Sequence, residues 1–175
     1  HAIGLHGPIG EAYPVADSLL LQQYEDASAA GSFGHVLSWD EWRLIGDIKE
    51  AYISMRYRTK AMSAALGGEL LPALGRRLQR GEPRLTFVGG HDTTLAWVGT
   101  QLDAEPYDLP ESVERHTPIG SKIVLGRWQC DDGTDRVSVD FVYQTTAQIR
   151  AGQLADRAHP PRVVRLRLKG LSPDA

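Results

Sequence analysis

The chain has 175 residues, of which 42% are hydrophobic and 23% are charged, a composition typical of a globular protein with one sizeable core. Its formal net charge of -3 and its pI near 6.1 provide no basic field for nucleic acid. No apolar run is long enough to cross a bilayer, and no signal peptide is visible, which leaves export open. Cys130 is the only cysteine of this sequence, so no disulfide can form within it. Cys130 is therefore either a free or buried thiol or paired with a cysteine outside this sequence.

The N-terminal stretch is predicted to pass from irregular chain into a helix. Residues 1–14 are rich in glycine and small side chains, which favours irregular structure. The apolar spacing from Val15 to Tyr24 predicts an amphipathic helix with Asp17 in its first turn. A carboxylate there complements the helix dipole, so the pattern alone leaves its role open.

Two further helices are predicted before residue 80. Ser38 and Glu41 form a capping-box pair, which indicates a helix that continues to about Arg56. Residues 59–79 are rich in Ala, Leu and Met and predict a long helix. Gly67-Gly68 weakens its middle, so a kink or a break is expected there.

The stretch from Arg84 to Leu102 predicts a strand, a glycine turn and a helix. Residues 85–88 form a short apolar run typical of a buried strand, which Gly89-Gly90 ends. Apolar residues then return at helical spacing, and Asp92 or a threonine after it is expected to be the N-cap. Ligands of open α/β sheets bind at the carboxyl ends of strands, and the free N–H groups of a helix N-terminus suit an anion such as phosphate.

His91 and Asp92 are the candidate catalytic residues at this junction. An imidazole can donate to phosphate oxygens, and an adjacent carboxyl group can protonate a leaving oxygen. The same pair is also typical of a helix cap with a packed histidine, and the pattern alone leaves both interpretations open. A metal site is disfavoured because no second histidine stands at ligand spacing, and no Walker A or dinucleotide motif predicts a cofactor.

The last third of the chain is expected to be mostly loop and strand. Residues 103–116 contain prolines among acidic residues and predict a surface loop that overhangs the site. Two β-rich runs, 123–130 and 136–143, flank a turn that contains Gly133, which is the signature of a hairpin. A closing strand is expected over residues 163–168.

The string GGHDTTLAWVG around His91 closely resembles the C-terminal His-Asp motif of the histidine acid phosphatases, in the branch of bacterial periplasmic phytases and glucose-1-phosphatases. The segment from Thr117 to Ser121 and the helix that carries Asp17 resemble further parts of the family, in the same order along the chain. The resemblance implies that His91 binds the transferred phosphoryl group and that Asp92 protonates the leaving alcohol. It also implies that Asp17 and Thr93 bind the substrate.

The resemblance further implies an α/β fold, a histidine-phosphatase-like three-layer sheet with flanking helices. Residues 1–57 are then part of a helical cap subdomain, and residues 58–175 are the C-terminal part of the α/β phosphatase domain. Phosphate monoesters are the implied substrates, without a cofactor, in a periplasmic or secreted protein. Family phytases carry a basic substrate-contacting residue where this chain has Ala64-Ala65-Leu66, which argues against a highly phosphorylated inositol.

The nucleophile of that family is the histidine of an RHGxRxP motif, which this sequence lacks. His6-Gly7-Pro8 and Arg115-His116 are near misses. We therefore expect the chain to be the C-terminal part of such an enzyme, inactive alone, with a missing N-terminal segment as its partner. The alternatives are a non-catalytic phosphate-ester-binding module and a helical interaction domain with an incidental helix cap.

Overall fold

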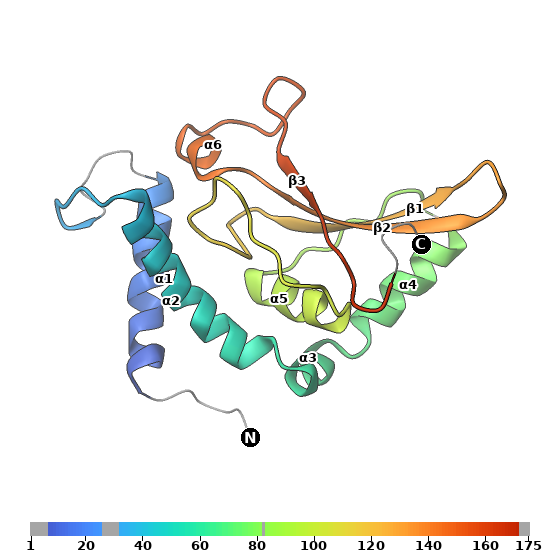
Figure 1. The fold of residues 1–175 in the computed structure, drawn as a ribbon, viewed down its shortest axis with the longest axis horizontal. Coiled ribbons are helices and arrows are strands. Elements are labelled where there is room, and N and C mark those ends of the chain that lie inside the picture. Colours follow the sequence, from blue (N-terminus) through green and yellow to red (C-terminus); the bar gives the residue numbers. More distant parts are fainter. Residues whose placement is uncertain (1–6, 26–31, 82, 172–175) are drawn as a thin grey trace.

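A computed structural model describes residues 7–25, 32–81 and 83–171 of the chain. The two longest helices, α1 and α2, lie at one end of the molecule, and the tip of the hairpin formed by β1 and β2 lies at the other (Figure 1). The shorter helix α5 packs on α3 and contributes apolar side chains to the core beneath the sheet. The elements in chain order are α1 (Pro8–Glu25), α2 (Trp39–Tyr57), α3 (Lys60–Gly67), α4 (Leu70–Arg80), α5 (Asp92–Gln101), β1 (Lys122–Gln129), β2 (Asp135–Tyr143), α6 (Thr146–Arg150) and β3 (Arg162–Arg165).

Helix α1 begins earlier than the sequence predicts. The expectation of irregular chain is wrong for residues 8–14, which are helical, while residues 1–6, including His6 of one near-miss motif, lie outside the described part. Pro14 lies inside the helix, where its fixed φ is compatible but one hydrogen bond is lost. Packing offsets that loss, because Tyr13 stacks on Tyr52 of α2 with ring centroids 4.1 Å apart.

The two predicted features of the next helices are confirmed. The Ser38 N–H donates to Glu41 Oε2 at 2.7 Å, and Ser38 Oγ accepts from the Glu41 N–H, so the capping box starts α2. The long helix expected over residues 59–79 is broken into α3 and α4. A Cβ at Gly67 would overlap the ring of Trp97, so glycine at the end of α3 permits the close approach of α5.

The described strands form one antiparallel sheet in the order β1-β2-β3. Lys122 pairs with Val142 and Gln129 with Asp135, and Gly133 takes a φ of 81° in the turn, which confirms the predicted hairpin. The closing strand β3 is shorter than expected. The core under the sheet holds five buried residues: Leu109, Val139, Phe141, Tyr143 and Leu166.

The predicted buried strand at residues 85–88 is not formed by the described chain. This segment joins no sheet, and Leu85 and Phe87 are each 84% exposed. A strand needs a neighbour for its backbone N–H and C=O groups, and none of the described strands pairs with these residues. The apolar side chains therefore border a groove instead of a core.

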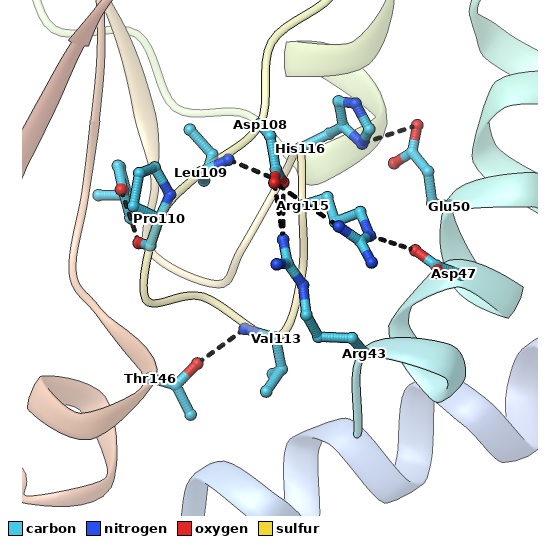
Figure 2. A network of polar contacts seen from close by, with 11 residues as sticks. Arg43, Asp47, Glu50, Asp108, Leu109, Pro110, Val113, Arg115, His116 and Thr146 are labelled. Atoms are coloured by element: carbon cyan, nitrogen blue, oxygen red, sulfur yellow. Dashed lines mark hydrogen bonds and ion pairs between the residues drawn. The ribbon is translucent and has the colours of Figure 1, made fainter. Parts of the chain in front are cut away.

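The loop predicted at the surface over residues 103–116 is only partly exposed, which corrects part of that expectation. Pro106 and Pro110 are at the surface, but Leu109, Ser112 and Val113 are almost completely inaccessible, so one stretch of the loop packs into the interior. Figure 2 shows how polar contacts hold it: Asp108 pairs with Arg43 of α2, and the Val113 N–H donates to Thr146 at the start of α6. These contacts fix the loop beside the N-terminus of α5.

Candidate active site

A cavity of about 670 Å³ lies between the start of α5, helices α1 and α2, and the loop that leads into β1. Three of the four predicted site residues line it: Asp17 from α1, His91 immediately before α5, and Asp92 at its first position. Thr93 is half-buried and is not among the lining residues, whereas its neighbour Thr94 is. The structure thus brings together residues that are 74 positions apart in the sequence, from 17 to 91.

The junction before α5 differs from the prediction in one detail. His91 is the N-cap residue, in extended conformation, and Asp92 is the first helical residue. The His91 N–H donates to Thr94 Oγ1 at 3.2 Å, and the Thr93 N–H donates to Asp92 Oδ1 at 2.7 Å. Asp92 therefore satisfies one of the free N–H groups of the first turn, and its negative charge is favourable at the positive end of the helix dipole.

Lys49 of α2, which the sequence patterns did not single out, also lines the cavity. Its Nζ lies 3.0 Å from Asp17 Oδ1, 3.2 Å from Asp92 Oδ2 and 2.9 Å from Glu114 Oε1. These carboxylates come from α1, α5 and the loop before β1, so one ammonium group joins three separate segments to α2.

Glu114 is the most buried of the three carboxylates. It is 5% exposed, and Tyr24 of α1 donates its hydroxyl proton to Glu114 Oε2 at 2.7 Å. Burial, and then the neighbouring Glu114 carboxylate, raise the pKa of Tyr24 well above its ordinary value, so the phenol remains a donor.

The ammonium group of Lys49 is kept charged by its partners. Burial by itself lowers the pKa of Lys49, but Glu114 and then Asp17 more than compensate and raise it above its ordinary value. A buried lysine is unfavourable unless it is paired, and here each of its three N–H donors has a carboxylate within reach.

The sequence did contain a weak signal for Lys49. Trp42, Gly46 and Ile53 form the buried face of α2, and Lys49 lies on the same face at helical spacing. A lysine on an otherwise apolar stripe indicates a buried ion pair, but its partners are distant in the chain and helical periodicity carries no information about them. Glu114 was not predicted as a site residue because it lies in a segment that was predicted to be a surface loop.

The carboxylates of the cavity converge on an ammonium group rather than on a metal site. Within residues 7–25, 32–81 and 83–171, no group of three or more His, Cys, Asp or Glu side chains is arranged to hold a metal ion. Among the helices described, none is long and apolar enough to cross a membrane.

No protein-family model matches the chain. It is similar to the glucose-1-phosphatase of Providencia rettgeri, with 32% identity over 173 residues that cover 95% of this chain and 41% of that protein. It is also similar to the phytase AppA of Escherichia coli strain K12, with 26% identity over 96% of this chain and 41% of that protein. The chain thus spans less than half the length of these curated relatives.

Solved structures agree with the sequence relatives. The chain superposes on the phytase of Citrobacter braakii with a TM-score of 0.85 and 28% identity, covering 97% of this chain and 45% of that one. The phytase of Hafnia alvei, in complex with myo-inositol hexakis sulphate, gives a TM-score of 0.80 and 25% identity over 96% of this chain and 45% of that one. The predicted α/β fold is confirmed by these neighbours.

Proposed function

Because this chain is related to the histidine acid phosphatases over nearly its whole length, we propose that it is the C-terminal part of an enzyme that hydrolyses phosphate monoesters. The observation that carries the proposal is the arrangement of His91 and Asp92, which line one cavity together at the N-terminus of α5. An imidazole, a carboxyl group and a helix N-terminus are the groups that bind a phosphoryl oxygen and protonate a leaving alcohol.

The proposed reaction has two steps. A histidine outside this chain attacks phosphorus and forms a P–N bond while the P–O bond to the alcohol breaks, and Asp92 gives its proton to the departing oxygen. Water then attacks the phosphohistidine, Asp92 accepts a proton from it, and the P–N bond breaks to release phosphate. His91 holds the non-bridging oxygens in both steps. Asp17 and Thr93 are the proposed substrate-binding residues.

A groove beside β1 supports the proposal that the nucleophile is supplied from outside the described residues. It has a volume of about 880 Å³ and runs between residues 83–88 and strand β1. Among the described strands β1 pairs only with β2, so its other edge is available for backbone hydrogen bonds. We propose that a β-strand from the missing N-terminal segment fills this groove.

The two cavities are adjacent, which gives that strand a route to the site. They share six lining residues: Leu74, Phe87, Val88, Lys122, Ile123 and Leu125. A residue at the end of a strand in the groove would therefore face the cavity of His91 and Asp92. On the same resemblance we propose residues 1–57 as part of a cap subdomain, residues 58–175 as part of the phosphatase domain, and a periplasmic or secreted location.

The proposal is tested on the complete polypeptide that contains this chain. Asp92→Asn is expected to slow hydrolysis of alkyl phosphates, whose leaving groups need a proton, by about 100-fold or more, because general acid catalysis contributes about that much. Hydrolysis of nitrophenyl phosphate, whose leaving group departs without a proton, is expected to fall much less.

Asp103→Asn is the matched control, because Asp103 pairs with Lys60 on the surface and lies outside the cavity. Equal losses on both substrates with Asp92→Asn would remove Asp92 from the proton-donor role. Binding of inorganic phosphate by the complete polypeptide without turnover of any ester would instead support the non-catalytic binding module.

A further inference from the structure

We propose that Lys49 is a positioning residue that holds the carboxyl group of Asp92 in its reactive orientation. This inference rests on the proposed function, in which Asp92 carries the proton. It assigns to Lys49 a role that acts through Asp92 and not through contact with the phosphoryl group.

Two contacts hold the carboxyl group of Asp92. Its Oδ1 accepts the Thr93 N–H at 2.7 Å, and its Oδ2 lies 3.2 Å from Lys49 Nζ. Two contacts from different directions fix the plane of a carboxyl group, whereas one contact leaves it free to rotate about χ2. Because a misplacement of about 1 Å can cost roughly 100-fold in rate, the second contact matters for proton transfer.

The ammonium group of Lys49 is engaged by carboxylates of the protein. Its Nζ lies between 2.9 and 3.2 Å from oxygens of Asp17, Asp92 and Glu114, and its side chain is only 10% exposed. A lysine that binds phosphate presents its ammonium group to the ligand as a point charge. The charge of Lys49 is instead paired with the carboxylates of the cavity wall.

Lys49 also offsets repulsion between carboxylates. Asp17 and Asp92 share its ammonium group, and Glu114, which is buried, pairs with the same group. Without the cation, the ionised form of Asp92, which is the base of the second step, would be repelled by Asp17 and would keep only the Thr93 N–H. Tyr24 holds Glu114, and Glu114 holds Lys49, so the position of Asp92 is set by a chain of contacts that begins in α1.

A purely structural role would also explain a buried ion pair, since Lys49 joins α1, α2 and α5. The matched control is Arg115, which follows Glu114 and pairs with Asp47 of α2 at 2.8 Å (Figure 2). It joins the same loop to the same helix, but neither of the two residues lines the cavity.

The experiment compares Lys49→Met, Lys49→Arg and Arg115→Met in the complete polypeptide. Lys49→Met is expected to lower kcat for alkyl phosphates by about 10- to 100-fold, with KM changed by less than about threefold, and to lower kcat for nitrophenyl phosphate by less than about threefold. Lys49→Arg, which keeps the charge, is expected to restore most of the loss. Arg115→Met is expected to lower thermal stability without changing the ratio of the two rates.

If Lys49→Met does not fold, Lys49→Gln replaces it; because Gln lacks the charge but keeps a hydrogen-bond donor, it is expected to show a smaller loss that is again confined to alkyl phosphates. Equal losses on both substrates, or no rescue by Lys49→Arg, overturn the positioning role and leave the proposed function intact. A wild-type polypeptide that hydrolyses neither substrate overturns the proposed function and this inference with it.

Discussion

The close approach of α2 to the loop of residues 103–116 predicts a specific loss of stability. Gly46 lies on the buried face of α2, and a Cβ built there would be 2.6 Å from the carbonyl oxygen of Val113. That oxygen is a backbone atom in a loop held by Thr146 and by its own burial, so it has little freedom to move. Gly46→Ala is therefore expected to push the loop, and Glu114 with it, away from α2.

The magnitude follows from two opposing effects. Replacing glycine by alanine in a helix interior stabilises it by about 1 kcal/mol. Overpacking a tight contact costs about 1–3 kcal/mol, because the carbonyl must yield by several tenths of an ångström. Gly75→Ala in α4 is the matched control, since a Cβ at Gly75 meets nothing within 4 Å and keeps the full gain in propensity.

The assay is urea unfolding of the two variants, followed by far-ultraviolet circular dichroism. Gly46→Ala is expected to be less stable than Gly75→Ala by about 1–3 kcal/mol, since the gain in propensity is common to both. Equal stabilisation of the two variants would mean that α2 does not approach Val113 as described, and the placement of Lys49 beside Glu114 would then lose its support.

Three further predictions concern the residues around the site. Tyr24→Phe is expected to cost about 1–3 kcal/mol at neutral pH, because buried Glu114 loses a donor, and urea titration measures the loss. Because burial and Glu114 raise the pKa of Tyr24 above its ordinary 10.0, its contribution to stability is fully present below pH 10 and is lost as the pH rises above it. Above pH 10 the free energy of unfolding should therefore fall less steeply with pH in Tyr24→Phe than in the wild type, by up to about 1.4 kcal/mol per pH unit. The same slope in both proteins would show that the phenol of Tyr24 does not cause this pH dependence. Phe87→Ser is expected to leave the stability of the isolated chain unchanged, since Phe87 is 84% exposed there. In the complete polypeptide, where a strand in the groove would cover Phe87, the same change is expected to cost about 1.5–3 kcal/mol. Equal effects in both proteins would refute occupation of the groove. The isolated chain is expected to bind inorganic phosphate much more weakly than the complete polypeptide in calorimetric titrations, and equal affinities would refute a contribution from the proposed N-terminal segment.

Features set by neighbouring residues were predicted well from the sequence. The capping box of Ser38 and Glu41 and the hairpin turn at Gly133 each depend on residues a few positions apart, and both are confirmed. The break at Gly67-Gly68 is likewise a local effect, because two glycines weaken a helix whatever surrounds it.

Features set by distant contacts were missed or misplaced. The start of α1 was set too late because the stacking of Tyr13 on Tyr52, which compensates for Pro14, leaves no trace in local propensity. The strand at residues 85–88 has the right residues but no described partner, and composition alone does not reveal whether a partner is present. Lys49 and Glu114 belong to the site only because α2 and the loop of residues 103–116 meet there.

The described walls of the cavity carry more negative than positive charge. Its described walls carry the carboxylates of Asp17, Asp92 and Glu114 but only two lysines, Lys49 and Lys122, besides His91. Lys49 is already paired with the three carboxylates, so its charge does not offset the negative charge of a bound phosphate ester.

A phosphatase site built on these walls therefore needs further positive charge from the side that is open. That side is where the cavity meets the groove along β1, at Phe87, Val88 and Ile123. A strand that enters the groove would bring its terminal residues to this boundary, where a cationic side chain would lie between His91 and the apolar wall. The N-terminal segment proposed above would account both for the deficit of positive charge in the described walls and for the edge of β1 that no described strand pairs with.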